Sequence, residues 1–121
     1  MRFLCLFKPD PATPPPEGKC LEDLRKYIED SYASGVLLAT EGFQPSPKDV
    51  RVRLTRGEFT VTDGPFTESK ELIGGYAILK LDSREEAIAH AKDFLRRVGG
   101  GESEIHELPD APPHAVGRAT R

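Results

Sequence analysis

A carboxylate at the end of a predicted strand is the first residue of this sequence that could do chemistry. Asp63 ends an alternating run of residues and stands directly before Gly64-Pro65. From such a position a carboxylate can project into a cleft and act as a general acid–base or as a hydrogen-bond acceptor for a substrate. The same residues also suit an Asx-type turn, in which the aspartate accepts backbone N–H bonds. The sequence leaves both roles open.

Four further residues are candidates for binding a ligand. Glu41 stands at the end of another predicted strand, and Tyr76 either presents its hydroxyl to a ligand or fills a half-buried core position. Arg53 shares a strand face with Arg51, so the two guanidinium groups either bind a carboxylate or face solvent. Phe66 is expected to pack as a plug against the core or against a dimer partner.

The sequence predicts no metal site and no bound cofactor. Its two cysteines, Cys5 and Cys20, both lie early, and its histidines are scattered at His90, His106 and His114. None of these residues has the Cys-x-x-Cys, His-x-x-x-His or His-Glu-x-x-His spacing of a metal site. There is also no nucleophile elbow, dinucleotide fingerprint or Walker loop, so a flavin or a nicotinamide is unsupported.

Composition and charge exclude some classes of partner for this chain. The chain has 121 residues, which suits one domain, and a formal net charge of −3, which leaves no basic footprint for a phosphate backbone. There is no apolar run of about 18 residues that could cross a membrane, and the apolar start of the chain ends too early for a secretory signal. We therefore expect a cytoplasmic protein with reduced cysteines, without direct nucleic-acid binding and without a membrane segment.

The elements that must position the candidate residues can be read from the apolar spacing. Leu21, Leu24, Ile28 and Tyr32 recur at helical intervals, whereas residues 49–62 alternate around a turn at Arg56-Gly57. The expected elements are strand 2–8, helix 17–34, strand 36–39, hairpin 49–62, strand 74–81, helix 84–98 and strand 103–108. The second helix begins with the capping box Ser83-Arg84-Glu85-Glu86.

This order of elements predicts an α+β fold. With the hairpin taken as an insertion, the remainder is βαββαβ, the ferredoxin-like arrangement, over residues 1–108, with 109–121 as a flexible tail. Two helices cover only one face of such a sheet, and the other face still carries apolar residues. We therefore expect a homodimer that packs through its sheet faces.

A longer string of residues resembles a known family. The segment VTDGPFTESKE at 61–71, followed by Gly74-Gly75-Tyr76, is similar to the DGPF branch of the YCII-related family. The resemblance continues through LLATEGFQP at 37–45, through 50–53 and through 83–87, and covers residues 2–108. It implies a dimeric α+β barrel with a ferredoxin-like subunit.

The resemblance implies less about activity. No single activity is established for this branch, and its members often occur beside sigma factors, which implies a regulatory or accessory role. Related barrels include muconolactone isomerases, small monooxygenases and a ring dehydrochlorinase. The family is thought to use a histidine on the first helix with an aspartate, but residues 17–34 contain no histidine. His90 lies in the second helix, where it can fill a packing role.

Two functions of different classes follow. One is a small-molecule-binding or regulatory dimer. The other is a cofactor-independent enzyme, of isomerase, lyase or monooxygenase type, that acts on a small organic acid with Asp63 as the acid–base group and Tyr76 or Arg53 as an orienting group. We favour binding, because no convergent pair of catalytic groups can be named. A purely structural interaction module is the third alternative, and the sequence identifies no ligand.

Overall fold

The computed structural model describes residues 1–66 and 73–109, which divide into two units. We call residues 1–42 and 73–109 the α/β unit and residues 43–66 the hairpin unit, and each is described by itself. Part of the family-like string, residues 67–72, and the predicted tail from residue 110 onward lie outside the described residues. The predicted domain of residues 1–108 stays a prediction.

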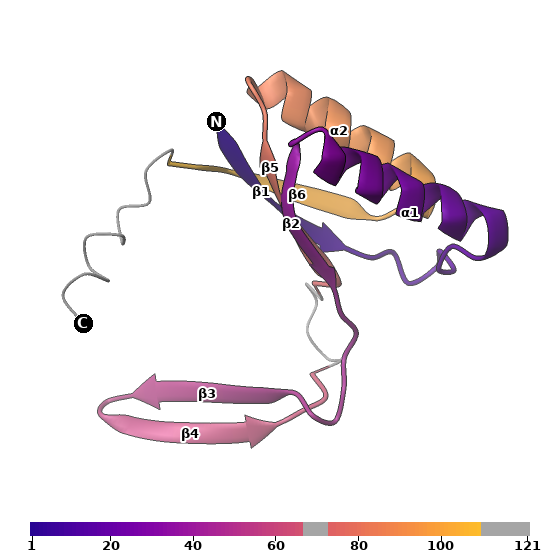
Figure 1. The fold of residues 1–121 in the computed structure, drawn as a ribbon. Helices are drawn as coiled ribbons and strands as arrows, with labels where there is room; N and C mark the ends of the chain where they lie inside the picture. Colours follow the sequence, from indigo (N-terminus) through magenta and orange to yellow (C-terminus); the bar gives the residue numbers. More distant parts are fainter. Residues whose placement is uncertain (67–72, 110–121) are drawn as a thin grey trace. The chain divides into compact units, whose positions relative to one another are not determined.

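The α/β unit contains two helices and a four-stranded sheet. Its elements are β1 (Arg2–Lys8), α1 (Gly18–Ala33), β2 (Leu37–Gly42), β5 (Gly75–Lys80), α2 (Arg84–Val98) and β6 (Glu102–Leu108). The strand order is β2-β5-β1-β6, and every neighbouring pair is antiparallel. Both helices lie on the same side of this sheet (Figure 1). The ferredoxin-like α+β prediction is confirmed, with β1 inside the sheet and β6 at its edge.

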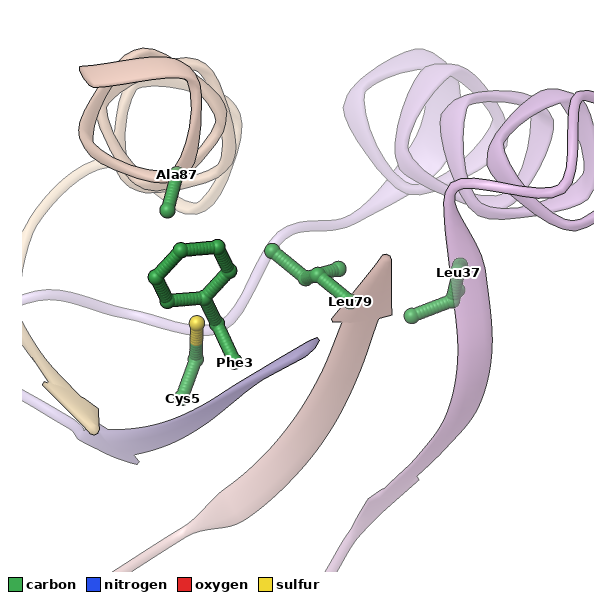
Figure 2. Close-up of a cluster of buried hydrophobic side chains, with 5 residues drawn as sticks. All are labelled: Phe3, Cys5, Leu37, Leu79 and Ala87. Atoms are coloured by element: carbon green, nitrogen blue, oxygen red, sulfur yellow. The ribbon is translucent and has the colours of Figure 1, made fainter. Parts of the chain in front are cut away.

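The core forms where alternate residues of the strands meet the helices. Phe3 and Cys5 of β1, Leu37 of β2 and Leu79 of β5 form one buried cluster with Ala87 of α2, which lies over Phe3 and Cys5 (Figure 2). Residues two apart in a strand share a face, so these side chains form one continuous apolar layer. Alanine at the contact point lets the helix approach the sheet closely.

The boundaries of α2 agree with its predicted capping chemistry. Ser83 is the N-cap and its hydroxyl accepts the Glu86 N–H at 3.2 Å. The Glu86 carboxylate accepts the N–H of Asp82, one residue before the cap, at 3.0 Å. The helix ends at Gly99, which has a φ of 92° that glycine adopts without steric strain.

The inward face of α1 differs from the predicted one. Tyr32 was expected beside Leu24 and Ile28, but its side chain is exposed, whereas Ser31 is buried and Tyr27 is half-buried. The face therefore runs through the residues at i, i+3, i+4 and i+7 from Leu24. Counting Tyr32 as apolar moved the predicted stripe one residue too far along the helix.

The strand predicted at 36–39 is also longer than expected. β2 continues to Gly42, so Glu41 lies within the strand and pairs with Tyr76 of β5. Close approach of the backbones makes this pairing possible. A Cβ added to Gly75 would stand 2.8 Å from the Glu41 carbonyl oxygen and 3.2 Å from the Cα of Gly42.

We expect the variant Gly75→Ala to lower the free energy of unfolding by about 1–3 kcal/mol, because the added methyl group meets backbone that cannot rotate away. Gly42→Ala is the matched control in the paired strand, since its Cβ would lie 3.6 Å from the nearest atom, an ordinary contact. Urea unfolding of both variants checks this. Equal stabilities would show that the two strands separate more easily than the structure indicates.

The hairpin unit is a two-stranded sheet with one apolar and one polar face. β3 (Val50–Thr55) and β4 (Glu58–Asp63) are joined at Arg56 and Gly57, both at positive φ, as the turn prediction required. Cross-strand pairing puts the apolar residues on one face, which consists of Val50, Val52, Leu54, Phe59 and Val61. Each of these five side chains is more than half exposed.

Candidate functional site

A cavity of about 270 Å³ lies within the α/β unit, between the helices and the sheet. Its wall is apolar on both sides. The helix side includes Leu24 and Ile28 of α1 and Phe94 of α2, and the sheet side includes Cys5 and Leu37. On the face of the sheet toward the helices, the end of β2 and the start of β5 carry small residues. This leaves room between the helices and the sheet. A concave, largely apolar space of this kind is typical of a small-molecule site.

The polar part of the wall is built around Tyr27 and His90. The Tyr27 hydroxyl donates to the His90 carbonyl oxygen at 3.4 Å, and the two rings lie 5.2 Å apart. The Arg97 guanidinium stacks 4.2 Å above the Tyr27 ring. Burial raises the pKa of Tyr27 to about 12, with a contribution from the charge of Asp93 that outweighs the opposing effect of Arg97. Tyr27 is therefore a neutral phenol at physiological pH.

The imidazole of His90 has a buried nitrogen without a partner. Among the described residues, His90 Nε2 and Arg2 Nε are the buried side-chain atoms that make no hydrogen bond, and only His90 borders the cavity. Burial lowers the pKa of His90 from its usual 6.5, against an opposing effect of Asp93. A buried polar atom left unpaired costs about 1–3 kcal/mol. The neutral imidazole therefore belongs to a residue that borders the cavity and carries a buried nitrogen without a hydrogen-bond partner.

This lowered pKa predicts a pH dependence of stability. Below pH 6.5 the unfolded chain binds a proton at His90 more readily than the folded chain does, so the free energy of unfolding falls as the pH drops. We expect the difference in unfolding free energy between about pH 7.5 and pH 5.5 to be smaller in His90→Phe than in the unmodified protein. Urea titrations at the two pH values check this, and an equal difference in both proteins would contradict it.

The other polar side chains of the wall are already occupied. The Ser31 hydroxyl donates to the Tyr27 carbonyl oxygen at 2.7 Å, and the Thr40 hydroxyl donates to the Tyr76 carbonyl oxygen at 2.8 Å. Burial raises the pKa of the Cys5 thiol, which a hydrogen bond with Ser103 partly offsets. Cys5 is therefore a neutral thiol and a poor nucleophile.

The structure brings two of the sequence-predicted site residues together. Glu41 and Tyr76 are register partners on β2 and β5, and both border the cavity. Alternation along β5 assigns the Tyr76 side chain to the face opposite that of Leu79, and the Glu41 side chain follows its partner. Their backbones thus form cavity wall, while their side chains belong to the sheet face away from the helices.

The other three candidates belong to the hairpin unit. Asp63 is opposite Val50, on the apolar face, whereas Arg53 is opposite Thr60, on the polar face, so the structure does not bring Asp63 and Arg53 together. Asp63 is exposed, and its carboxylate accepts no hydrogen bond from the described residues. Phe66 packs under the Arg51 guanidinium at 4.0 Å from its ring centre.

At the base of the hairpin, Asp49 rather than Asp63 accepts the backbone N–H bonds that were considered for Asp63. The Asp49 carboxylate accepts the Ser46 N–H at 2.8 Å, and the Asp49 carbonyl oxygen accepts the Gly64 N–H at 2.7 Å. The Gly64-Pro65 bond is cis. Asp49 therefore holds the base of the hairpin together, and the carboxylate of Asp63 has no structural task among the described residues.

Over the described ranges, no group of three or more histidine, cysteine or acidic residues is placed to hold a metal ion. None of the helices there is long and apolar enough to cross a membrane. Both cysteines, Cys5 and Cys20, are free thiols.

Comparison with known proteins decides the family. The model of the YCII-related domain matches residues 1–102. The chain belongs to the YCII-related family. It is 35% identical over 70 residues to an uncharacterised protein from Rhizobium meliloti (strain 1021), a stretch of 58% of this chain and 53% of that protein. The chain thus spans about half the length of this curated relative.

Among solved structures, this YCII-related chain is similar to the 5-chloro-2-hydroxyhydroquinone dehydrochlorinase TftG of Burkholderia phenoliruptrix AC1100, in complex with 2,5-dihydroxybenzoquinone. The identity is 16% and the TM-score 0.42, over 92% of this chain and 96% of that chain. A likeness of this size carries no argument about function.

Sequence reasoning missed the two residues that give the cavity of this YCII-related chain its polar character. His90 was assigned a packing role, and Tyr27 was passed over in favour of Tyr32. One signal was available, since Tyr27 lies three residues after Leu24 and one before Ile28 and so shares their helix face. The lack of a hydrogen-bond partner at His90 Nε2 depends on tertiary packing, so the sequence carries no signal for it.

Proposed function

We propose that this YCII-related protein binds a small, largely apolar molecule in the cavity of the α/β unit. The observation that carries the proposal is the cavity itself, about 270 Å³ between the helices and the sheet, with wall from Leu24, Ile28 and Phe94. An apolar cavity of about 150 Å³ holds benzene, so a substituted single ring fits here.

We also propose that the working unit is a homodimer that packs through sheet faces. The apolar face of the hairpin unit supports this, because a two-stranded hairpin alone is marginally stable and its five apolar side chains are more than half exposed. The string around Asp63-Gly64-Pro65-Phe66 supports membership of the DGPF branch. The free thiols support a reduced, cytoplasmic setting. The link to a sigma factor stays a prediction.

A cavity-filling variant tests binding. Ala91 borders the cavity, whereas Ala89, two residues earlier on α2, is exposed and lies outside it. We expect toluene and 4-ethyltoluene to raise the melting temperature of the unmodified protein and of Ala89→Leu. They should leave Ala91→Leu unchanged, because the larger side chain occupies the space of the ligand.

Circular dichroism establishes first that Ala91→Leu is folded, since overpacking can cost about 1–3 kcal/mol. A folded Ala91→Leu that responds to both compounds as Ala89→Leu does would show that the ligands bind elsewhere. The absence of any response in all three proteins would contradict the proposed function.

A further inference from the structure

We infer that the cavity takes a neutral phenol, with the ring among the apolar side chains and the phenolic hydroxyl bonded to the imidazole of His90. The inference rests on the proposed function, because it names the class of ligand for the same cavity. Three observations carry it: the size of the cavity, the charge state of its wall and the place of the neutral His90 imidazole in the described part of that wall.

The size of the cavity selects a single ring with a short substituent. Its volume is about 270 Å³, somewhat below the lower end of the range for drug-sized ligands, about 300–1,000 Å³. The apolar side chains of Leu24, Ile28 and Phe94 from the helices and of Leu37 from β2 face a ligand from opposite layers. A flat hydrocarbon body therefore replaces water with apolar contact on both of its faces.

The charge of the wall selects a neutral ligand. Glu41 is the one formally charged residue that borders the cavity in the described part of the chain, and β alternation assigns its carboxylate to the other face of the sheet. The nearby Arg97 guanidinium is stacked on the Tyr27 ring rather than free for an anion. An organic acid in its ionised form would be buried here without a counter-charge, which is strongly unfavourable.

The hydrogen bonds that the cavity wall already makes favour a ligand with a hydroxyl group. Ser31, Thr40 and Tyr27 already donate to backbone carbonyl oxygens, so they have no free hydroxyl proton for a ligand. His90 Nε2 has no partner. A phenolic hydroxyl both accepts and donates, so it pairs with either tautomer of the neutral imidazole.

The test compares three ligands that differ in one substituent on an ethyl-bearing ring: 4-ethylphenol, 4-ethyltoluene and 4-ethylbenzoate. Titration calorimetry on the full chain should show 4-ethylphenol binding about tenfold more tightly than 4-ethyltoluene, and 4-ethylbenzoate binding weakest. In His90→Phe, which keeps a ring against Tyr27, the preference for the phenol should fall to about twofold or less. In the control His106→Phe the preference should remain, since His106 is an exposed histidine of β6 that does not border the cavity.

A nitrogen NMR measurement keeps the inference testable if His90→Phe fails to fold. The imidazole nitrogen resonances of His90 should shift with 4-ethylphenol and not with 4-ethyltoluene. Equal affinity of the unmodified protein for these two compounds would overturn the inference and leave the proposed function standing. Tightest binding of 4-ethylbenzoate would also overturn it. If none of the three compounds binds, both the inference and the proposed function fall.

Discussion

Replacing Leu79 by alanine should lower the free energy of unfolding of this protein by about 2–5 kcal/mol. Leu79 has 0% exposure and lies on β5 between Phe3 of β1 and Leu37 of β2, in the apolar layer that the helices cover. Truncation removes apolar contacts and leaves a hole that these hydrogen-bonded strands can fill only in part. A loss of that size is a large fraction of the total stability of a small domain, about 5–15 kcal/mol.

Leu38→Ala is the matched control, because Leu38 is 45% exposed at the irregularity of β2. We expect it to change the unfolding free energy by less than about 1 kcal/mol. Urea unfolding followed by circular dichroism measures both variants. A loss in Leu38→Ala as large as in Leu79→Ala would mean that the layer of Figure 2 is not the main core.

The second large effect concerns the apolar face of the hairpin unit. We expect Phe59→Glu to convert a dimer into a monomer, because Phe59 is 73% exposed on that face and a carboxylate there cannot be buried without a partner. Burying one such charge costs several kcal/mol per subunit, which is enough to dissociate a dimer of ordinary affinity at micromolar concentration.

Thr60→Glu provides the control, since Thr60 is the next residue along β4 and lies on the polar face opposite Arg53. It adds the same charge without touching the apolar face, so the dimer should persist. Sedimentation velocity distinguishes the two results. A monomeric unmodified protein, or a dimer that survives Phe59→Glu, would contradict packing through this face.

The fold could be predicted from the sequence because its local signals agree with one another. Alternation over β3 and β4, the turn at Arg56-Gly57 and the Ser83 cap each specify an element without help from distant residues. The order of these elements along the chain then indicates the ferredoxin-like βαββαβ arrangement. Boundaries were less predictable: the end of β2 depends on pairing with β5, and a short sequence window does not contain its partner.

The candidate site was only partly predictable. Strand ends drew attention to Asp63 and Glu41, but the cavity lies on the helix face of the sheet, where Tyr27 and His90 supply its polar character. Whether a half-buried histidine is paired or unpaired is decided by which side chains surround it after folding. That property arises between elements far apart in the chain, so residue types and spacing do not reveal it.

The central claim is that the cavity of the α/β unit is the binding site, and mapping a ligand onto the protein by NMR tests it most directly. Amide resonances of the isotope-labelled full chain are followed during titration with 4-ethylphenol. We predict saturable shifts at the residues that border the cavity, above all Ile28, His90 and Ala91, with the hairpin strands Val50–Thr55 and Glu58–Asp63 unaffected. Shifts confined to those two strands, or no saturable shift in any assigned resonance, would contradict the claim.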